Sequence, residues 1–149
     1  IALQEIRRAG RYRHPFTMAY LDIDAFKSVN DRWGHSTGDA LLAVVARTVR
    51  ETIRATDTVA RLGGDEFALL LPETDYEAAD IVVRKVREDL LQAMRERGWP
   101  VTFSIGVVTF LIPPESVDSM IRTADGFMYE VKHAGKDMIR HRQVDRLAA

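Results

Sequence analysis

The stretch Arg61-Leu62-Gly63-Gly64-Asp65-Glu66-Phe67 stands between two runs typical of β-strands, residues 59–62 and 67–71. Two glycines between such runs predict a tight hairpin, because glycine tolerates the positive φ that hairpin turns need. Asp65 and Glu66 would then lie side by side at the rim of the turn, where each disfavours the other's ionisation. A divalent cation, which prefers oxygen ligands, would relieve that repulsion. The alternative is a surface hairpin with two solvated acids.

The composition describes one soluble globular domain. The chain has 149 residues, 46% hydrophobic and 29% charged, with no run of about 18 apolar residues and no signal-peptide pattern. The absence of cysteine excludes disulfides and thiolate metal sites and is compatible with a reducing cytoplasm. The net charge of −1, from 21 basic and 22 acidic residues, argues against a general nucleic-acid binder.

Hydrophobic periodicity outward from the hairpin predicts an alternation of strands and helices. A helix that ends near residue 13 comes first. It is followed by a buried strand at 16–23, a short helix at 25–30, a loop at 31–38, a helix at 39–56, the hairpin, a helix at 76–97, a strand at 101–110, a helix at 116–133 and a strand at 138–141. This order predicts the α+β class, with one mixed, largely antiparallel sheet and helices packed on it.

The first strand ends in two further acids, Asp22 and Asp24. If that strand lies beside the hairpin, Asp22 joins Asp65 and Glu66 at one edge of the sheet. Such an oxygen-rich cluster suits the paired Mg²⁺ ions that clamp a displacement at phosphorus. The alternatives are that Asp24 caps the next helix, and that Asp39 is an acid in the first turn of its helix.

Three lysines stand around these acids in the predicted order of elements. Lys27 lies one helical turn beyond Asp24, and Lys132 and Lys136 are four residues apart at the end of the last helix, on one face. Phosphoryl transfer needs cations that neutralise phosphate charge, which gives these lysines a role. The alternative is that each is an ordinary solvated surface lysine.

Five blocks of sequence, in the same order along the chain, resemble the GGDEF family of diguanylate cyclases. RLGGDEF resembles the motif that names the family. The other four blocks are DIDAFKSVND (22–31), GHSTGD (34–39), SIG (104–106) and the helix pattern of Ala124-Asp125, Tyr129 and Lys132. Together they cover nearly the whole chain.

The resemblance implies a fold similar to the palm domain of nucleotidyl cyclases and polymerases. It also implies condensation of two GTP molecules into cyclic di-GMP with release of pyrophosphate, by attack of a 3′-hydroxyl on an α-phosphate. Two domains would meet face to face as a homodimer, each presenting one GTP. Mg²⁺ or Mn²⁺ would serve, two ions per active site, and neither nucleic acid nor membrane would contact this segment.

The resemblance also implies roles for individual residues. Asp22, Asp65 and Glu66 would hold the metal with the backbone carbonyl of Ile23, and Asp65, Glu66 and Lys27 would act in catalysis. Asp65 is the candidate for deprotonating the 3′-hydroxyl. Substrate binding would fall to Asn30 and Asp39 at the guanine base and to His35, Gly63, Gly64, Lys132 and Lys136 elsewhere on the nucleotide.

A second site is implied by the R-x-x-D sequence of Arg54 and Asp57. Asp57 falls six residues before Gly63, where the family places an inhibitory site for its product. Arginine binds guanine bidentately and aspartate accepts from its N–H edge. Arg84, Lys85 or Arg87 would complete this site, and the sequence does not choose among them. The alternative is a helix-end arginine paired with a nearby acid.

Two departures from the family pattern stand out. Gly135-Lys136-Asp137 replaces the more frequent Gly-Arg-Asn, so the charge stays but the bidentate fork of arginine is lost. The family's opening segment is absent before Ile1, so we expect a domain excised from a larger signalling protein, with a sensory or dimerising region upstream. Such a domain would be cytoplasmic, whether or not a membrane sensor is attached.

Two other functions compete with an active cyclase. The first is a catalytically silent module that binds GTP or cyclic di-GMP and signals by occupancy. The intact acids Asp22, Asp65 and Glu66 argue against it. The second is a related cyclase that prefers another base, against which the presence of both Asn30 and Asp39 argues.

Overall fold

The computed structural model describes residues 14–112 and 116–145. Its elements follow the order β1 (Phe16–Asp24), α2 (Phe26–Trp33), α3 (His35–Thr52), β2 (Thr58–Gly63), β3 (Glu66–Leu71), α4 (Tyr76–Arg97), β4 (Thr102–Phe110), α5 (Val117–His133) and β5 (Ile139–Val144). This is the predicted order of strands and helices. The helix expected before residue 14 lies outside the described residues.

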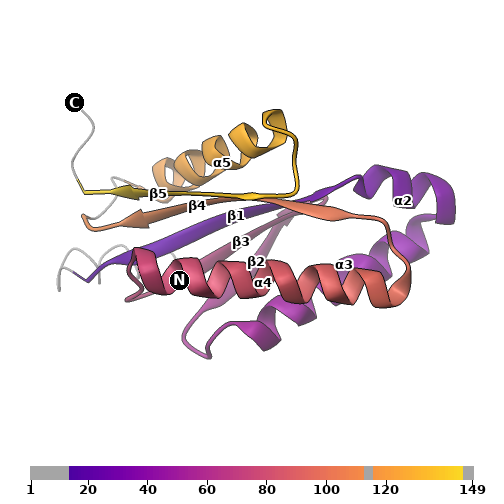
Figure 1. Cartoon of the computed structure of the whole chain (residues 1–149), viewed down its shortest axis with the longest axis horizontal. Helices are drawn as coiled ribbons and strands as arrows, with labels where there is room; N and C mark the ends of the chain where they lie inside the picture. The colour runs from indigo at the N-terminus through magenta and orange to yellow at the C-terminus, as the bar shows by residue number, and fades with distance from the viewer. Residues whose placement is uncertain (1–13, 113–115, 146–149) are drawn as a thin grey trace.

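The five strands form one sheet in the order β2-β3-β1-β4-β5. All neighbours pair antiparallel except β4 and β5, which are parallel. The prediction of a mixed, largely antiparallel sheet is therefore confirmed. In Figure 1, α5 lies on one face of the sheet, and α3 and α4 lie on the other. β1 is the central strand, with helices over both faces, which explains its almost continuous apolar sequence.

Side chains of β1 alternate between two apolar layers. Leu21 and Ile23 pack in the layer beneath α3 and α4, and Met18 and Tyr20 pack in the layer beneath α5. Because successive side chains of a strand point to opposite faces, the even-numbered residues at the end of β1 belong to the α5 side. The last turns of α5 are thereby placed over the acidic end of β1.

Gly106 in β4 lets α5 approach the sheet closely. A Cβ atom added at this position would lie 2.2 Å from the backbone nitrogen of Met128 and 2.3 Å from the carbonyl oxygen of Ala124. Both are backbone atoms, so the helix itself would have to move. Glycine at position 106 is therefore what allows α5 to pack this closely on the sheet.

The boundaries predicted between residues 31 and 56 are wrong. The loop expected at 31–38 is almost entirely helical, because α2 runs to Trp33 and α3 begins at His35. Only Gly34 separates them, with a φ of +92° that favours glycine. Asp39 is therefore the fifth residue of α3 rather than a first-turn acid, and α3 ends four residues earlier than predicted, at Thr52.

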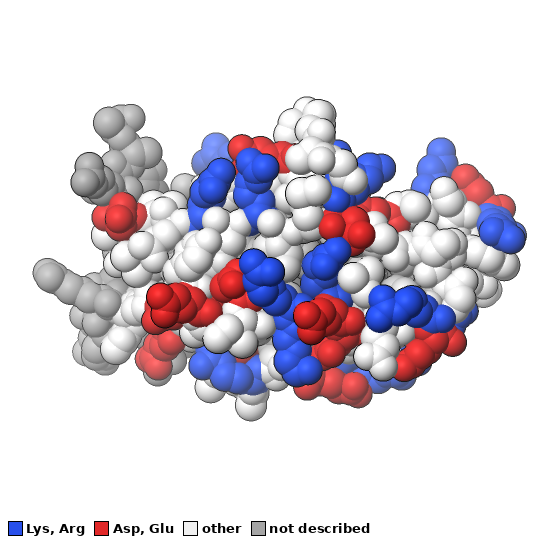
Figure 2. Space-filling view, viewed as in Figure 1, with Lys and Arg blue, Asp and Glu red and all other residues white. Residues whose placement is uncertain are grey.

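The surface carries charges of both signs. Figure 2 shows Lys and Arg side chains interspersed with Asp and Glu over the face that α4 crosses. Pairs one helical turn apart, such as Arg84 with Asp80 and Lys85 with Asp89, contribute to this pattern. Among the described residues, no helix is long and apolar enough to cross a membrane.

A row of buried polar side chains crosses the sheet beneath α4. The Thr17 hydroxyl donates to the carbonyl of Thr74 at 3.0 Å and lies 2.8 Å from the Thr109 hydroxyl. Thr109 in turn lies 2.7 Å from Nε2 of His141, whose ring stacks on Tyr76. Buried polar groups are stabilising only when they are paired, so this row ties β1, β4 and β5 to one another.

The burial of His141 predicts a pH dependence of stability. Burial lowers the pKa of His141 to about 4 from its usual 6.5. The unfolded chain therefore binds a proton between about pH 6.5 and pH 4 that the folded chain does not bind, and stability falls as the pH falls through that window. The largest contribution is about 3 kcal/mol. The measurement is the free energy of unfolding in urea at pH 7 and pH 4.

The matched variants are His141→Gln, which keeps a partner for Thr109 but does not titrate, and His133→Gln, which changes an exposed histidine. Between pH 7 and pH 4 the unchanged chain should lose more stability than His141→Gln, and as much as His133→Gln. Parallel losses in all three proteins would show that His141 is not the titrating group.

Candidate active site

Antiparallel pairing of β1 with β3 brings three carboxylates together. The register places Asp22 opposite Glu66, and the backbone N–H of Ile23 donates to the carbonyl of Asp65 at 3.2 Å. One carboxylate oxygen from each of Asp22, Asp65 and Glu66 lies within 4.8 Å of the other two. The positive φ of Gly64, +43°, belongs to the turn that carries Asp65 to this position. The predicted convergence of the three acids is therefore observed.

The electrostatics of this acidic cluster (Asp22, Asp65 and Glu66) suit a cation. Burial, followed by the nearby charge of Asp65, raises the pKa of Asp22 to about 7. Oδ1 of Asp22 is buried and has no hydrogen-bond partner among the described residues. A buried acceptor without a donor, next to a second carboxylate, is the environment that a hard divalent cation stabilises. These residues therefore fit Mg²⁺ or Mn²⁺.

Glu66 is oriented by Tyr20. The Tyr20 hydroxyl donates to Oε2 of Glu66 at 2.6 Å. Burial and the Glu66 carboxylate both raise the pKa of Tyr20, so its hydroxyl remains a donor. Asp125 on α5 belongs to the same surroundings, because burial and the charge of Glu66 raise its pKa. Among the described residues no hydrogen bond reaches Oε1 of Glu66, so this oxygen is available to another partner.

Asp24 gathers contacts from three parts of the chain and does not cap α2. The N-cap position belongs to Ala25, which makes no side-chain cap bond. Instead the Asp24 carboxylate accepts from the hydroxyls of Thr102 and Ser104, each at 2.7 Å. It also accepts from Nζ of Lys132 at 2.7 Å and from the backbone N–H of Asp137 at 3.1 Å.

Lys132 links Asp24 to the acidic cluster. Its Nζ lies 3.3 Å from Oδ2 of Asp22 as well as 2.7 Å from Oδ1 of Asp24. Burial alone would raise the pKa of Asp24, but hydrogen bonds from Lys132 and the two hydroxyls outweigh burial and hold it below its usual range. Lys132 therefore stays charged beside the acids.

The junction of α2 and α3 forms the candidate base-binding region. Oδ1 of Asn30 is buried without a hydrogen-bond partner in the described part of the chain. A Cβ atom at Gly38 would lie 1.8 Å from that oxygen, so any side chain at Gly38 would displace Asn30. Asp39 lines an adjacent pocket of about 390 Å³, whose other lining residues include Leu42, Ala43, Ala46, Arg50, Val59, Arg61 and Phe67.

Other predicted site residues stand apart from the acidic cluster. Lys27, His35 and Lys136 are exposed, and within residues 14–112 and 116–145 no hydrogen bond or ion pair joins their side chains to the acids. The placement of Lys132 and Lys136 on one helical face is wrong, because α5 ends at His133 and Lys136 lies in the following loop. Gly63 and Gly64 are exposed in the hairpin.

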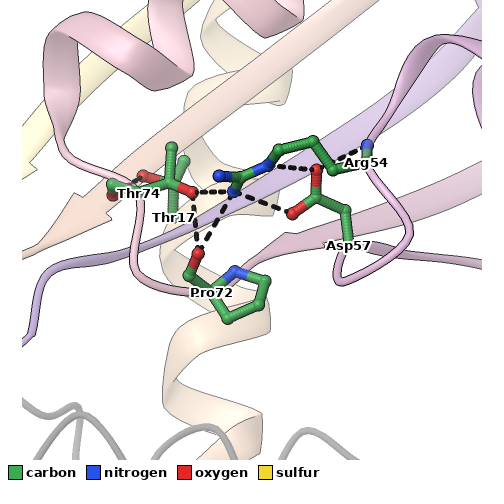
Figure 3. A network of polar contacts seen from close by, with 5 residues as sticks. All are labelled: Thr17, Arg54, Asp57, Pro72 and Thr74. Carbon is green, nitrogen blue, oxygen red and sulfur yellow. Dashed lines mark hydrogen bonds and ion pairs between the residues drawn. The ribbon is translucent and has the colours of Figure 1, made fainter.

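Arg54 and Asp57 are paired with each other (Figure 3). Arg54 donates from Nη2 to Oδ1 of Asp57 at 3.0 Å and from Nε to Oδ2 at 3.2 Å. Its Nη2 also donates to the Thr74 hydroxyl and the Pro72 carbonyl. The Asp57 side chain is fully buried, whereas 53% of the Arg54 side chain is exposed. This pairing is the alternative that the sequence left open, and the product-binding role stays a prediction.

Sequence reasoning missed Tyr20 and the contacts of Asp24. Both residues lie two positions from Asp22 on the central strand, so strand alternation alone would have placed them on the same face. It also missed Arg87, assigned only to the predicted product site. Arg87 donates from Nη2 to the carbonyl and to Oδ1 of Asp137, at 2.9 and 2.6 Å. No local pattern indicates a contact across 50 residues.

The acidic cluster predicts that divalent cations stabilise the fold. Asp65→Asn removes one of the mutually repelling charges, so it should raise the melting temperature in chelator and abolish the further rise caused by Mg²⁺. At ten times the dissociation constant, bound Mg²⁺ contributes about 1.4 kcal/mol. Thermal unfolding with and without Mg²⁺ measures both effects, and Glu88→Gln, which changes an exposed acid on α4, is the control. An equal Mg²⁺ response in all three proteins would contradict cation binding here.

Comparison with known proteins connects this site to a family. The sequence model described as "Diguanylate cyclase, GGDEF domain" matches residues 2–138. The chain is 33% identical to the "Probable diguanylate cyclase DgcT" of Escherichia coli over 144 residues, which cover 93% of the chain and 32% of that protein. It is 34% identical to "Diguanylate cyclase A" of Treponema denticola over 140 residues, which cover 92% of the chain and 38% of that protein. The chain thus spans about a third of the length of these relatives.

Solved structures agree with this assignment. Diguanylate cyclase SiaD of Pseudomonas aeruginosa, in complex with its activator SiaC, is similar with a TM-score of 0.83 and 32% identity, covering 94% of this chain and 55% of SiaD. The GGDEF domain of DgcB from Caulobacter crescentus, in complex with c-di-GMP, is similar with a TM-score of 0.81 and 27% identity, covering 93% of this chain and 84% of the DgcB chain. The motifs, the fold and these matches agree, and the chain belongs to the GGDEF domain family of diguanylate cyclases.

Proposed function

We propose that this chain is a catalytic domain that condenses two GTP molecules into cyclic di-GMP with release of two pyrophosphates. The observation that carries the proposal is the intact cluster of Asp22, Asp65 and Glu66, within 4.8 Å of one another, in a chain of this family. Two relatives that are named as diguanylate cyclases, from Escherichia coli and Treponema denticola, support the proposal. The three intact acids beside Lys132 argue against a silent receptor module.

The chemistry is an in-line displacement at phosphorus. The 3′-oxygen of one GTP forms a bond to the α-phosphorus of the other, the bond from that phosphorus to pyrophosphate breaks, and the same exchange in the opposite direction closes the ring. Two Mg²⁺ ions held by Asp22, Asp65, Glu66 and the Ile23 carbonyl would supply positive charge at the reacting phosphates. Asp65 takes the proton from the 3′-hydroxyl, and Tyr20 keeps Glu66 turned toward the cluster.

The lysines offset the charge of the phosphate chain. Lys132 stands beside Asp22, 3.3 Å away, and is the cation nearest the acids in the described part of the chain. Lys27 and Lys136 have exposed side chains that form no ion pair with the described residues, and these side chains reach the outer phosphates. Phosphoryl transfer depends mainly on such alignment and charge, because the protein makes no covalent bond to the substrate.

Selectivity for guanine rests on Asn30 and Asp39. The buried Oδ1 of Asn30 accepts no hydrogen bond from the described residues. The N1–H and exocyclic amine of guanine are donors that adenine does not present in the same pattern. A carboxylate such as Asp39, at the rim of the adjacent pocket, accepts from the same edge. A site with a buried, unpaired acceptor discriminates strongly against a ligand that leaves it unpaired.

Each domain holds one GTP, so catalysis needs two copies of the domain. The acidic cluster lies where β1 ends and β3 begins, and a second copy would present its nucleotide there. A dimerising or sensory segment of a longer protein would bring the copies together, in line with the greater length of the relatives. The rate per chain therefore rises with protein concentration.

Cyclic di-GMP is also the inhibitor of this domain at Arg54. The Asp57 side chain is fully buried and its carboxylate accepts from Arg54, whereas 53% of the Arg54 side chain is exposed. The exposed part of the Arg54 side chain is therefore the surface that product stacks on. The DgcB domain of the comparison was solved in complex with c-di-GMP, which supports product binding in this fold.

The product assay tests the proposed activity. Purified chain incubated with GTP and Mg²⁺ should yield cyclic di-GMP and pyrophosphate, identified by chromatography and mass, whereas ATP should yield no cyclic product. Glu66→Ala should lower turnover by at least about a hundredfold, because removing one group that stabilises charge in the transition state costs about 3–4 kcal/mol. Undiminished turnover in a folded Glu66→Ala variant would contradict the assigned site.

The product-site proposal predicts that Arg54→Ala relieves inhibition by cyclic di-GMP at least tenfold without changing uninhibited turnover. The inhibition constant is the measurement, and Arg122→Ala, which changes an exposed arginine on α5 outside both sites, is the control. Arg54→Ala leaves Asp57 as an unpaired buried charge, which is destabilising. The double variant Arg54→Ala/Asp57→Asn removes that charge and keeps the test usable. An unchanged inhibition constant in the double variant would remove Arg54 from the product site.

A further inference from the structure

Asp24 is a buried carboxylate that holds several parts of the chain together. Only 5% of its side chain is exposed. The side-chain and backbone donors that reach it from the described residues all lie outside β1. The donors are the Thr102 and Ser104 hydroxyls of β4, Nζ of Lys132 on α5, and the backbone N–H of Asp137 in the loop before β5. Asp24 thus joins the end of α5 and the following loop to the central strand.

The loop that Asp24 holds has an uncommon backbone. Lys136 has a φ of +65° and Asp137 a φ of +53°, so two successive residues with side chains adopt the left-handed region. Such a conformation persists only where the surroundings hold it, and it is found preferentially at functional sites. Here the N–H of Asp137 donates to Asp24, and the N–H of Lys136 donates to the carbonyl of Val131 at 2.9 Å.

A second group holds the same loop from the opposite face of the sheet. Arg87 on α4 donates to the carbonyl and to Oδ1 of Asp137, as described above. The loop is therefore fixed at Asp137 by a carboxylate and by a guanidinium. The side chain of Lys136, the residue between Asp137 and Gly135, remains exposed beside this fixed point.

We propose that Asp24 is a positioning residue for the triphosphate of the substrate: it fixes Lys132 beside the acidic cluster and fixes the loop from which Lys136 projects. This inference rests on the proposed function, because it assumes that both lysines face phosphates. Asp24 itself touches neither the substrate nor the reacting atoms. It acts through Lys132 and Lys136. Buried residues that hold a ligand-binding side chain in place commonly act in this indirect way.

The competing explanation is that Asp24 only stabilises the fold. If Asp24 only stabilises the fold, its loss should weaken the binding of every ligand of the site equally. If Asp24 positions the two lysines, its loss should weaken only the binding of ligands that these lysines contact. Asp24→Asn keeps the size of the side chain and an acceptor for a β4 hydroxyl. It loses the charge that orients Lys132 and the second acceptor oxygen that Asp137 uses.

The test is a binding cycle with a non-hydrolysable GTP analogue and with guanosine, which carries no phosphate. In the otherwise unchanged chain, Asp24→Asn should weaken binding of the analogue at least tenfold and of guanosine less than twofold. In a chain that already carries Lys132→Met and Lys136→Met, Asp24→Asn should weaken binding of the analogue less than threefold, because the groups it positions are gone.

Two control variants separate this effect from general damage. Val83→Ala truncates a buried core residue of α4 and should lower the melting temperature without changing affinity for the analogue. Asp118→Asn removes an exposed acid at the start of α5 and should change neither. Circular dichroism and thermal unfolding establish that Asp24→Asn is folded at the temperature of the binding measurement.

Equal losses for the analogue and guanosine, or the same loss with and without the two lysines, would overturn the proposal. Either result can be obtained in a chain that forms cyclic di-GMP, which leaves the proposed function standing. A chain that binds the analogue but forms no product fails the proposed function alone, because the binding cycle does not depend on turnover. No binding of the analogue by the unchanged chain would overturn both.

Discussion

The register between β1 and β3 is the constraint on which the candidate site depends. It sets Asp22 opposite Glu66, and the hydrogen bond from Ile23 to the carbonyl of Asp65 closes the hairpin turn against the same strand end. A shift of one residue would send Asp22 to the other face of the sheet, beneath α3 and α4. The apolar layers on both faces oppose that shift, because Leu21 and Ile23 would then have to exchange places with the residues beneath α5.

Charge compensation at the end of β1 follows from this register. Three carboxylates within 4.8 Å would repel one another, and burial makes the repulsion stronger at Asp22. Lys132 on α5 offsets part of this negative charge through its ion pair with Asp22. Lys132 also pairs with Asp24, so the acids and the lysine form one connected group. Gly106 contributes to this charge compensation although it lies away from the acids. It allows α5 to approach the sheet closely, which places the end of α5, with Lys132, above the end of β1.

Much of this could be predicted from local sequence. Periodicity and turn residues predicted the order of all nine described elements, and the two glycines predicted the hairpin that positions Asp65. The boundary between α2 and α3 was missed because residues 31–38 contain two glycines, of which only Gly34 breaks the helix while Gly38 packs inside it. The role of Asp24 was missed because its donors come from residues 78 to 113 positions away, beyond any local pattern.

The central proposal is that Asp22, Asp65 and Glu66 together hold the cations on which GTP is turned over. The most direct measurement is a crystal structure of the chain with a non-hydrolysable GTP analogue and Mn²⁺, using anomalous scattering to locate the metal. We expect anomalous peaks from Mn²⁺ between these three carboxylates and the phosphates of the analogue, and its guanine base beside Asn30 and Asp39. A bound nucleotide with no metal at the three carboxylates, or with its metal elsewhere, would contradict it.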